Sequence, residues 1–315
     1  MLILKGIDGL VVHSSSFSAN YRNFFQKEKS YDYVYLGNSL SKRMFDIKEI
    51  DSVLDVQSIN LGSSAQHFYI THAIFDELVK KEALYPDKLL MIGVSPWQFK
   101  SFTKEDLKYF QMQAIDELEF SANYVEILAR MYHINEYPIV ISPTIRFHSD
   151  LCENIKTTPS KLEASLRSNG KGFDYNVTRR LSKKLRESKK DLREVAAAYN
   201  ASVNDAVSES IGGRQEQMLI DMIKVCKENN IRVLFYTAPA INMLYEKNDH
   251  GKIKFLEELF ESNQVNYINF NRIFNDLKLT ADDFSDYSHL NIYGNKKTNT
   301  VFFDSILPMS GVNYR

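Results

Sequence analysis

Cysteine is scarce in this sequence, since only Cys152 and Cys226 occur among its 315 residues. They form no CxxC pair and no cluster with histidine, which argues against a disulfide framework and against a structural zinc site. An excess of charge is also absent, because 39 Lys and Arg oppose 40 Asp and Glu and leave a formal net charge of −1. Nucleic-acid-binding proteins typically carry a basic excess, so we expect no nucleic-acid partner.

Long hydrophobic runs and phosphate-binding loops are missing as well. The apolar stretch within residues 1–17 is interrupted by Lys5 and Asp8, is too short for a membrane span, and lacks the layout of a signal peptide. We therefore expect a soluble protein, cytoplasmic as the sequence stands, or extracytoplasmic if an anchor precedes it in a longer chain. Neither G-x-x-x-x-G-K-S/T nor G-x-G-x-x-G occurs, which argues against a nucleotide-binding protein. We expect no cofactor.

The sequence does contain a regular alternation of short apolar runs with longer amphipathic stretches. This alternation is typical of strands that are each followed by a helix on a mostly parallel sheet. We therefore predict one α/β domain over residues 1–315. The predicted strands are 33–36, 56–61, 88–94, 138–142, 232–237 and 265–270, and the predicted helices are 66–81, 215–229, 251–260 and 292–306.

Residues 144–211 have a different composition, with fewer apolar and more charged residues. Lys and Arg are concentrated at 179–193, with Glu187 and Asp191 among them. We predict an inserted helical subdomain here. Its basic face is more often a solvated helix surface than a binding site. The alternative is a lid, or a patch that contacts an acidic carrier or a membrane surface.

A serine follows the first predicted strand in the sequence YLGNSLS. Gly37 permits a tight turn, and Ser39 begins the next predicted helix. A serine in this position has its hydroxyl at the edge of the sheet and its own N–H directed toward a developing oxyanion. Ser39 is therefore a candidate nucleophile. The alternative is that Ser39 only caps the helix.

An acid and a histidine lie three residues apart before the last predicted helix, in DFSDYSHLNIYGN. This spacing allows Asp286 to reach Nδ1 of His289, which leaves Nε2 to take a proton from a serine hydroxyl. The alternative is a surface acid and a histidine at a helix N-terminus, since Asp282 and Asp283 also lie here. An open parallel sheet gathers the carboxyl ends of its strands at one edge, so we expect Ser39 and His289 to meet.

The two motifs together resemble those of the SGNH/GDSL hydrolase family. In that family a G-D/N-S-L element follows the first strand and a D-x-x-H element lies near the C-terminus. GNSLS at 37–41 and DYSHLN at 286–291 match in content, order and position. The resemblance covers approximately residues 30–142 and 214–310.

This resemblance implies a three-layer α/β/α, flavodoxin-like sandwich with a mostly parallel sheet and a helical insertion. It also implies a catalytic triad in which Ser39 forms an acyl-enzyme, His289 is the base and Asp286 orients His289. No cofactor and no metal belong to this chemistry.

The resemblance further implies a set of oxyanion donors. The family uses the backbone N–H of a Gly after the second strand, and SINLGSSAQ offers Gly62, or Ala65 when one counts from Asn60. The family's Asn after the third strand is missing from IGVSPWQF, where Ser95 and Gln98 are the candidate replacements. Loss of one such donor reduces the rate on the order of 100-fold. The candidate oxyanion and substrate-binding residues are Asn38, Gly62, Ala65, Ser95, Trp97 and Gln98.

The run Ser-Pro-Trp-Gln-Phe at 95–99 is similar to a branch of the family that modifies cell-surface polymers. That branch includes proteins related to D-alanyl transfer on teichoic acids and to polysaccharide O-acetylation. We therefore predict a serine esterase or O-acyltransferase that acts on an acylated carbohydrate or a related small ester. Trp97 is a candidate to stack on a sugar, although a lone Trp more often packs in a core or at a rim. The alternative is a catalytically weak relative that binds a polysaccharide or a partner protein.

The other histidines do not indicate a metal site. His67 and His72 are five residues apart, which is a poor spacing for ligands on one helix face, so we interpret them as surface or packing residues. His133, His148 and His250 have no ligand partner nearby in the sequence.

Overall fold

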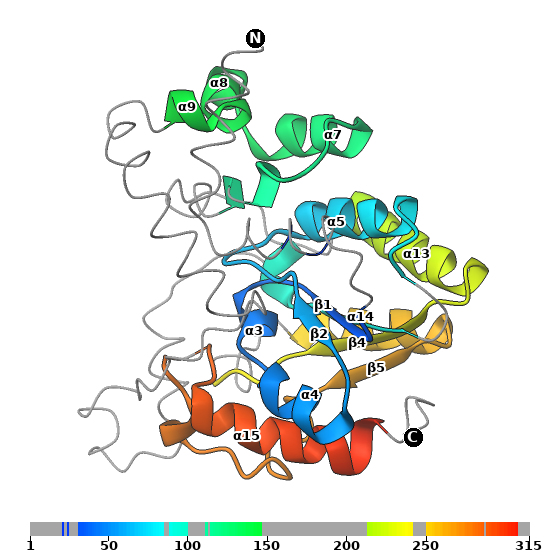
Figure 1. Ribbon diagram of the computed structural model, residues 1–315, viewed down its shortest axis with the longest axis vertical. Coiled ribbons are helices and arrows are strands. Elements are labelled where there is room, and N and C mark those ends of the chain that lie inside the picture. Colours follow the sequence, from blue (N-terminus) through cyan, green and yellow to red (C-terminus); the bar gives the residue numbers. More distant parts are fainter. Residues whose placement is uncertain are drawn as a thin grey trace.

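A five-stranded parallel sheet is the centre of the fold. The computed structural model describes residues 21, 24, 31–84, 88–99, 111–112, 114–146, 213–241, 250–286 and 288–307 (Figure 1). Within them the strand order is β2-β1-β3-β4-β5, and every pairing is parallel. The strands are β1 (Tyr33–Leu36), β2 (Ser58–Asn60), β3 (Leu89–Gly93), β4 (Arg232–Thr237) and β5 (Asn266–Asn269). These five strands confirm five predicted ones, and β1 and β4 coincide with the predicted ranges.

The register of the sheet places the ends of neighbouring strands side by side. Tyr33 on β1 pairs with Ser58 on β2 and with Leu89 on β3, and Leu89 pairs with Arg232 on β4. All residues of β1, β2 and β3 are buried, as expected for a parallel sheet that is covered on both faces. The loops that follow these three strands therefore leave the sheet at the same edge.

Helices flank the sheet on both faces. The α-helices are α3 (Ser39–Lys42), α4 (Ile47–Leu54), α5 (Phe68–Lys80), α7 (Ala122–Met131), α8 (Tyr137–Ile141), α9 (Pro143–Arg146), α13 (Gly213–Glu228), α14 (His250–Ser262) and α15 (Ile292–Val301). The described residues also form the 3₁₀ helices η1 (Pro96–Phe99), η2 (Ile134–Glu136) and η5 (Ala281–Asp283), and a π-helix, η6 (Phe302–Ile306), continues α15. The four predicted helices are confirmed, with ends that differ by a few residues.

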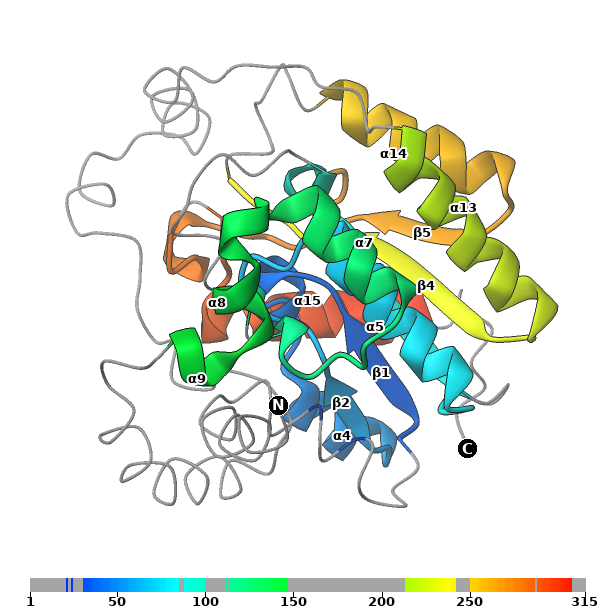
Figure 2. The same ribbon diagram turned by 90° about the horizontal axis from the view of Figure 1, so that it is seen from above.

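Two hydrophobic clusters, one on each side of the sheet, define the layers. Side chains of α5, α7, α13 and α14 pack against one face, where Val34 and Leu36 of β1 point. Side chains of α3, α4 and the end of α15 pack against the other face, where Tyr33 and Tyr35 point. Figures 1 and 2 show α5 and α13 over one face, with α4 and α15 on the opposite side. This α/β fold is consistent with a flavodoxin-like sandwich.

The predicted strand at 138–142 is wrong, because these residues form the helix α8. A five-residue apolar run is too short for its periodicity to distinguish a strand from a helix. Pro138 lies in the first turn of α8, a position that tolerates a residue without an N–H. The side chain of Arg146 in α9 also donates to the carbonyls of Ile139 and Val140, which are acceptors near the end of a short helix.

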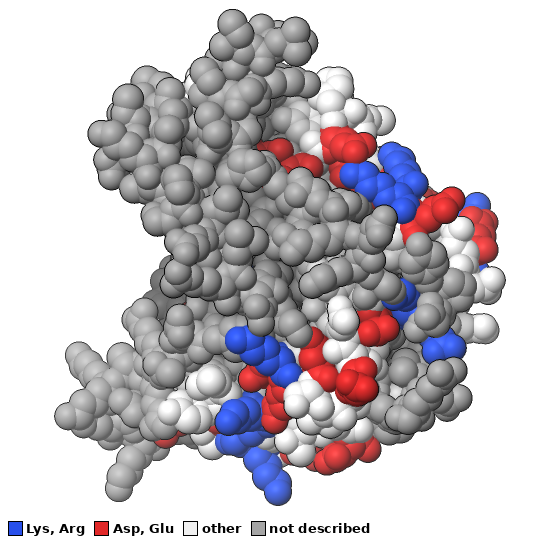
Figure 3. Space-filling model, viewed as in Figure 1, with Lys and Arg blue, Asp and Glu red and all other residues white. Residues whose placement is uncertain are grey.

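Of the predicted insertion at 144–211, the structure describes only 144–146, which belong to α9. The basic segment 179–193 lies outside the described residues. On the face drawn in Figure 3, the described acidic and basic side chains are interspersed. Among the described residues, no helix combines the length and the apolar character that crossing a membrane requires.

Candidate active site

Ser39 lies at the point where β1 gives way to α3. Gly37 has φ +133°, a value that side chains disfavour, and a Cβ there would approach the carbonyl oxygen of Gly93 to 2.8 Å. Asn38 then caps α3, because its Oδ1 accepts from the N–H of Leu40 at 3.1 Å. Ser39 is the first residue of α3 and is partly exposed between two buried neighbours. The local sequence therefore directs this serine to the edge of the sheet.

Close packing of α3 on the sheet holds this position. Ser41 is buried and lies against Gly37 and Gly93. A Cβ on Gly93 would overlap the hydroxyl of Ser41 and lie 2.6 Å from its Cβ. Glycine at the end of β3 thus allows the helix that carries Ser39 to sit directly on the strands.

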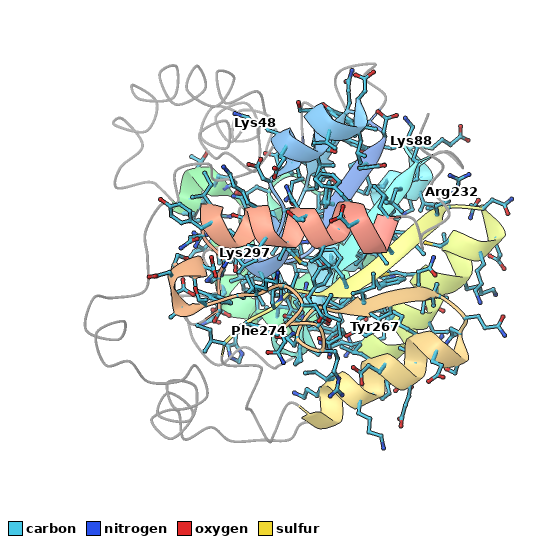
Figure 4. The ribbon with its side chains drawn as sticks, turned by 90° about the horizontal axis from the view of Figure 1, so that it is seen from below. Lys48, Lys88, Arg232, Tyr267, Phe274 and Lys297 are labelled. Atoms are coloured by element: carbon cyan, nitrogen blue, oxygen red, sulfur yellow. The ribbon has the colours of Figure 1, made fainter. Side chains whose placement is uncertain are left out.

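Asp286 and His289 lie in a closed loop before α15. An antiparallel bridge joins Phe284 to Leu290, and Ser285 donates its N–H to the carbonyl of His289 at 2.9 Å. Lys297 of α15 donates to Asp283 Oδ2 at 2.7 Å at the base of this loop (Figure 4). The first two contacts close the loop on itself, and the contact from Lys297 anchors its beginning to α15.

The structure brings Ser39, His289 and Asp286 into one hydrogen-bonded line. His289 Nε2 lies 2.8 Å from Ser39 Oγ, and His289 Nδ1 lies 2.9 Å from both carboxylate oxygens of Asp286. The side chain of His289 is 22% exposed. In this geometry the imidazole is placed to accept the serine proton, and the carboxylate is placed to hold the required tautomer.

The carboxyl of Asp286 is held in its charged form. Its burial raises the pKa, but the hydrogen bond and the charge of His289 outweigh that effect, together with the N–H groups of Ser288 and His289. Both N–H groups donate to Oδ1 at 2.9 Å. The net result is a pKa below the usual value of 3.8, so Asp286 is an anion at neutral pH.

A second contact joins the beginning of the described chain to its end. Three buried side chains on one face of α15 bond the backbone of residues 43–46, and we call this set the α15 contact. Asn295 donates to the Arg43 carbonyl, Thr298 donates to the Met44 carbonyl at 2.8 Å, and Asn299 donates to the Asp46 carbonyl at 3.0 Å and accepts from its N–H at 3.3 Å. The segment that follows Ser39 and the helix that follows His289 are thereby held together.

The two candidate oxyanion amides after β2 differ in their partners. The N–H of Gly62 donates to Asn60 Oδ1 at 2.9 Å and is therefore occupied. Ala65 has φ +53°, and no described residue accepts a hydrogen bond from its N–H. The N–H of Ser39 likewise has no acceptor among the described residues. Of the two candidates, Ala65 is the one with an available amide.

The candidates after β3 also differ. Ser95 Oγ accepts from Asn38 Nδ2 at 3.0 Å, so the structure brings Ser95 next to the residue that precedes Ser39. Gln98 points into the protein, where its Oε1 accepts from the N–H of Ser95 at 2.8 Å and its side chain is 1% exposed. The backbone of Trp97 belongs to η1, but its side chain lies outside what the structure describes.

Sequence reasoning named Asn38, Ser95 and Gln98 as candidates but missed the buried hydrogen-bonded set to which they belong and which connects the loops after β1, β2 and β3. We call it the loop network, and all of its side chains are at most 7% exposed. Its only signal in the sequence is a series of amide and hydroxyl side chains within otherwise apolar segments. The members are Asn38, Ser63, Gln66, Thr71, Ser95 and Gln98.

The histidines on α5 are packing residues, as one of the two interpretations had it. His67 caps α5 by accepting from the N–H of Tyr69 at 3.3 Å, and the rings of His67 and Tyr69 stack with their centroids 5.1 Å apart. His72 is buried, and burial lowers its pKa from the usual 6.5. His148 lies outside the described residues. In the described part of the chain, no group of three or more His, Cys, Asp or Glu residues is placed to hold a metal ion.

Comparison with known proteins does not assign a family. No protein-family model matches the chain, and no curated protein has a significantly similar sequence. The class is therefore defined by the molecule itself, as an α/β protein with a five-stranded parallel sheet and a Ser-His-Asp line at its carboxyl edge.

Proposed function

We propose that this protein is a serine-dependent ester hydrolase or O-acyltransferase of the SGNH/GDSL type. The observation that carries the proposal is the pair of distances at His289, 2.8 Å to Ser39 Oγ and 2.9 Å to Asp286. Such a line is the arrangement that activates a serine hydroxyl at neutral pH. The sequence order, with serine after the first strand and D-x-x-H near the last helix, supports the same family.

In the proposed reaction, Ser39 Oγ attacks the ester carbonyl while its proton moves to His289 Nε2. The bond from the carbonyl carbon to the alcohol oxygen then breaks, and His289 returns the proton to the departing alcohol. The acyl group remains on Ser39. Water or a second hydroxyl group next attacks this acyl-enzyme, with His289 as base, and restores the free serine. Water gives an esterase, and a sugar hydroxyl gives a transferase.

The proposed oxyanion hole consists of the N–H groups of Ser39 and Ala65. Both amides lack a described acceptor, whereas the amide of Gly62 is bonded to Asn60. The hydroxyl of Ser95 is the proposed third donor. The side-chain amide of Asn38 donates to one lone pair of the Ser95 hydroxyl, and no described residue accepts the proton of that hydroxyl. Ser95 thus replaces the side-chain donor that the family's Asn supplies, and Gln98 does not.

The proposed substrate is an acylated glycan or polyol. This rests on the similarity of the run at 95–99 to the branch that modifies cell-surface polymers, with Trp97 as the proposed sugar-stacking residue. The insertion at 144–211 is proposed as a lid or docking element for the polymer. Comparing transfer with hydrolysis, using acetylated donors and glycan acceptors, distinguishes the two reactions, since a transferase yields more acylated acceptor than free acetate.

A serine-directed fluorophosphonate tests the proposed nucleophile. The native protein is expected to be labelled and to hydrolyse a short nitrophenyl ester. Ser39→Ala and His289→Ala are expected to abolish labelling, and Asp286→Asn to reduce turnover about 100-fold or more. Ser52→Ala, on the exposed side of α4, is the matched serine control. Labelling that survives Ser39→Ala rules out this nucleophile, and absence of labelling in the native protein rules out the enzyme.

A second candidate is a catalytically weak relative that binds a polysaccharide or a partner protein. The side-chain amides near the site favour it, because Asn38 Nδ2 is bonded to Ser95 and Gln98 Nε2 to Thr71. Each of these amides has one of its two N–H donors engaged within the protein, which leaves at most one for an oxyanion. This candidate predicts polymer binding that is unchanged by Ser39→Ala, together with no detectable fluorophosphonate labelling of the native chain.

A further inference from the structure

We infer that Thr71 is a positioning residue whose hydroxyl holds the proposed oxyanion donors in place, an inference that rests on the proposed function. Thr71 lies in the first turns of α5 and is fully buried, so it does not touch substrate. Its hydroxyl is the member of the loop network at which hydrogen bonds from two different loops meet.

The hydroxyl of Thr71 uses its full hydrogen-bonding capacity. Its oxygen accepts from Gln66 Nε2 at 3.0 Å and, in a longer contact, from Gln98 Nε2 at 3.5 Å. Its proton is placed to go to the carbonyl of His67, at 3.5 Å. A hydroxyl has one donor and two acceptor sites, and all three are engaged here.

The first arm of the network encloses Ala65. Gln66 Oε1 accepts from both the N–H and the hydroxyl of Ser63, each at 2.9 Å, so the loop is closed across the residue whose amide we propose as donor. Ala65 has φ +53°, a left-handed conformation that is unfavourable for a residue with a Cβ. Such a conformation persists when the surrounding contacts determine it. The bonds from Ser63 to Gln66 determine the conformation of Ala65, and the hydroxyl of Thr71 holds the side chain of Gln66 in place.

The second arm leads to Ser39. Gln98 Oε1 accepts from the N–H of Ser95, and the hydroxyl of Ser95 accepts from Asn38, which caps the helix that begins with Ser39. This arm is coupled to Thr71 through the longer contact of 3.5 Å. Loss of the Thr71 hydroxyl is therefore expected to disturb the loop at Ala65 more than the loop at Ser39.

Burial makes the network sensitive to the loss of one hydroxyl. Replacing Thr71 by Val keeps the shape of the side chain but leaves the amides of Gln66 and Gln98 without their partner. A buried amide without a partner is unfavourable, so the two loops are expected to rearrange until both amides find another acceptor. Rearrangement moves the Ala65 N–H away from the position of the oxyanion, which lowers the rate of the chemical step more than the binding of substrate.

The experiment compares Thr71→Val with Thr71→Ser in the full chain, counting active sites with the fluorophosphonate. Thr71→Val is expected to lower kcat per titrated site about 10-fold to 100-fold, less than the loss of a whole donor, with KM changed less than about twofold. Inhibition by a boronic acid that mimics the tetrahedral state is expected to weaken by the same factor as kcat/KM. Thr71→Ser keeps the hydroxyl and is expected to stay within about threefold of native kcat.

Thr298→Val is the matched control, because it also removes a fully buried hydroxyl, one that bonds the Met44 carbonyl at 2.8 Å. It is expected to lower Tm while kcat per titrated site stays within about twofold. If Thr71→Val behaves like this control, Thr71 has only a structural role and the inference is wrong, while the proposed function stands.

A readout without turnover separates the inference from the proposed function. Amide hydrogen exchange of residues 61–67 is expected to accelerate roughly tenfold in Thr71→Val and to stay unchanged in α15. Unchanged exchange at 61–67 overturns the positioning role whether or not the protein is an enzyme. If exchange accelerates in Thr71→Val but the native protein takes no label, the proposed function is overturned, and with it the catalytic part of the inference.

Discussion

Two buried polar sets flank Ser39, and they make different kinds of hydrogen bond. In the loop network, most of the connecting bonds run from one side chain to another, as from Asn38 to Ser95 and from Gln66 to Thr71. In the α15 contact, side chains such as Thr298 and Asn299 bond the backbone of residues 43–46. A backbone group is present whatever residue occupies the position, whereas a side-chain partner is lost with a single substitution.

Because of this difference, we expect damage to the loop network to change the catalytic rate and damage to the α15 contact to change the stability of the fold. The loop network surrounds the amides that we propose as oxyanion donors, so damage to it is expected to change the chemical step. The α15 contact joins two segments beyond the line of Ser39 and His289, whose hydrogen bond of 2.8 Å is direct. Damage to the contact is therefore expected to lower the free energy of unfolding and to leave each folded molecule active.

The largest expected effect comes from Gly93→Ala, because it disturbs α3, on which both sets depend. The new Cβ would overlap the hydroxyl of Ser41 and approach Tyr236 Cζ to 3.2 Å. We expect the free energy of unfolding to fall by about 3 kcal/mol, as for an overpacked core, and kcat/KM to fall at least about 100-fold. Urea unfolding and ester hydrolysis measure the two effects.

Two further variants test the cause. Gly213→Ala is the control, since a Cβ there meets nothing within 4 Å and the residue begins α13. It is expected to change stability by less than about 1 kcal/mol. The double variant Gly93→Ala with Ser41→Gly removes the overlapping side chain and is expected to recover most of the activity. No recovery would mean that Gly93 acts through another neighbour.

The next effect concerns the α15 contact. Asn299→Leu leaves the N–H of Asp46 without its acceptor and removes one of the two donors to the Asp46 carbonyl, which keeps the N–H of Ile50. We expect the free energy of unfolding to fall by about 2 kcal/mol. The expected kcat per titrated site stays within about threefold of native. Thr300→Val, one residue later on the exposed side of the helix, is the control and is expected to change stability by less than about 0.5 kcal/mol. A loss of kcat per titrated site greater than about threefold would show that the α15 contact also affects the chemical step, and the distinction between the two sets would then be wrong.

The meeting of Ser39, Asp286 and His289 could be predicted from the sequence, and the reason is topological. Parallel strands with helical crossovers bring their carboxyl ends to one edge whatever the loops contain. The strands themselves were predictable because their apolar runs are short and lie between charged helical stretches. The run at 138–142 was predicted wrongly because its composition fits a strand equally well, and only its contacts with Arg146 and the core decide for a helix.

The interior of the site could not be predicted, because it depends on the conformation of loops. The sequence offered Gly62 or Ala65 as the oxyanion donor without a preference, but the side chain of Asn60 occupies the amide of Gly62. Ala65 was an alternative only by counting, and its left-handed backbone becomes visible only in three dimensions. Periodicity gives no information on which loop side chains turn inward, so Gln66 and Thr71 had no sequence signal of their own.

A smaller expected effect is a difference between the two sides of the site in how the free energy of unfolding depends on pH. His72 lies on α5, is buried, and has no partner for Nδ1 among the described residues. Burial lowers its pKa; Asp76 on the same helix, Glu126 on α7 and Asp221 on α13 act in the opposite direction, and Arg214 on α13 lowers it further. The unfolded chain therefore binds a proton more tightly than the folded one. Stability is expected to be complete above about pH 6.5 and to fall as the pH drops below that value.

His72→Gln is expected to remove this dependence. Urea unfolding at several pH values between 5 and 8 gives the slope of the unfolding free energy with pH, and the slope of the variant should be smaller than that of the native chain. His133→Gln, on an exposed histidine, controls for the removal of a histidine as such. Equal slopes in the native chain and His72→Gln would show that His72 does not contribute to the pH dependence of stability in this range.

The smallest expected effect lies on the side of α15. The pKa of Asp286 is below its usual 3.8, so its contribution to stability is complete above about pH 4 and is lost as the pH falls through the lower value of the folded state. Asp286→Asn should therefore destabilise the chain slightly at pH 7, and the difference from native should shrink below pH 4, as measured by urea unfolding. The side chain is 47% exposed, so added salt should weaken the effect. This change falls in a more acidic range than that of His72. A native chain whose stability is constant from pH 5 to 8 but declines near pH 4 would therefore show that His72 contributes nothing to its acid sensitivity.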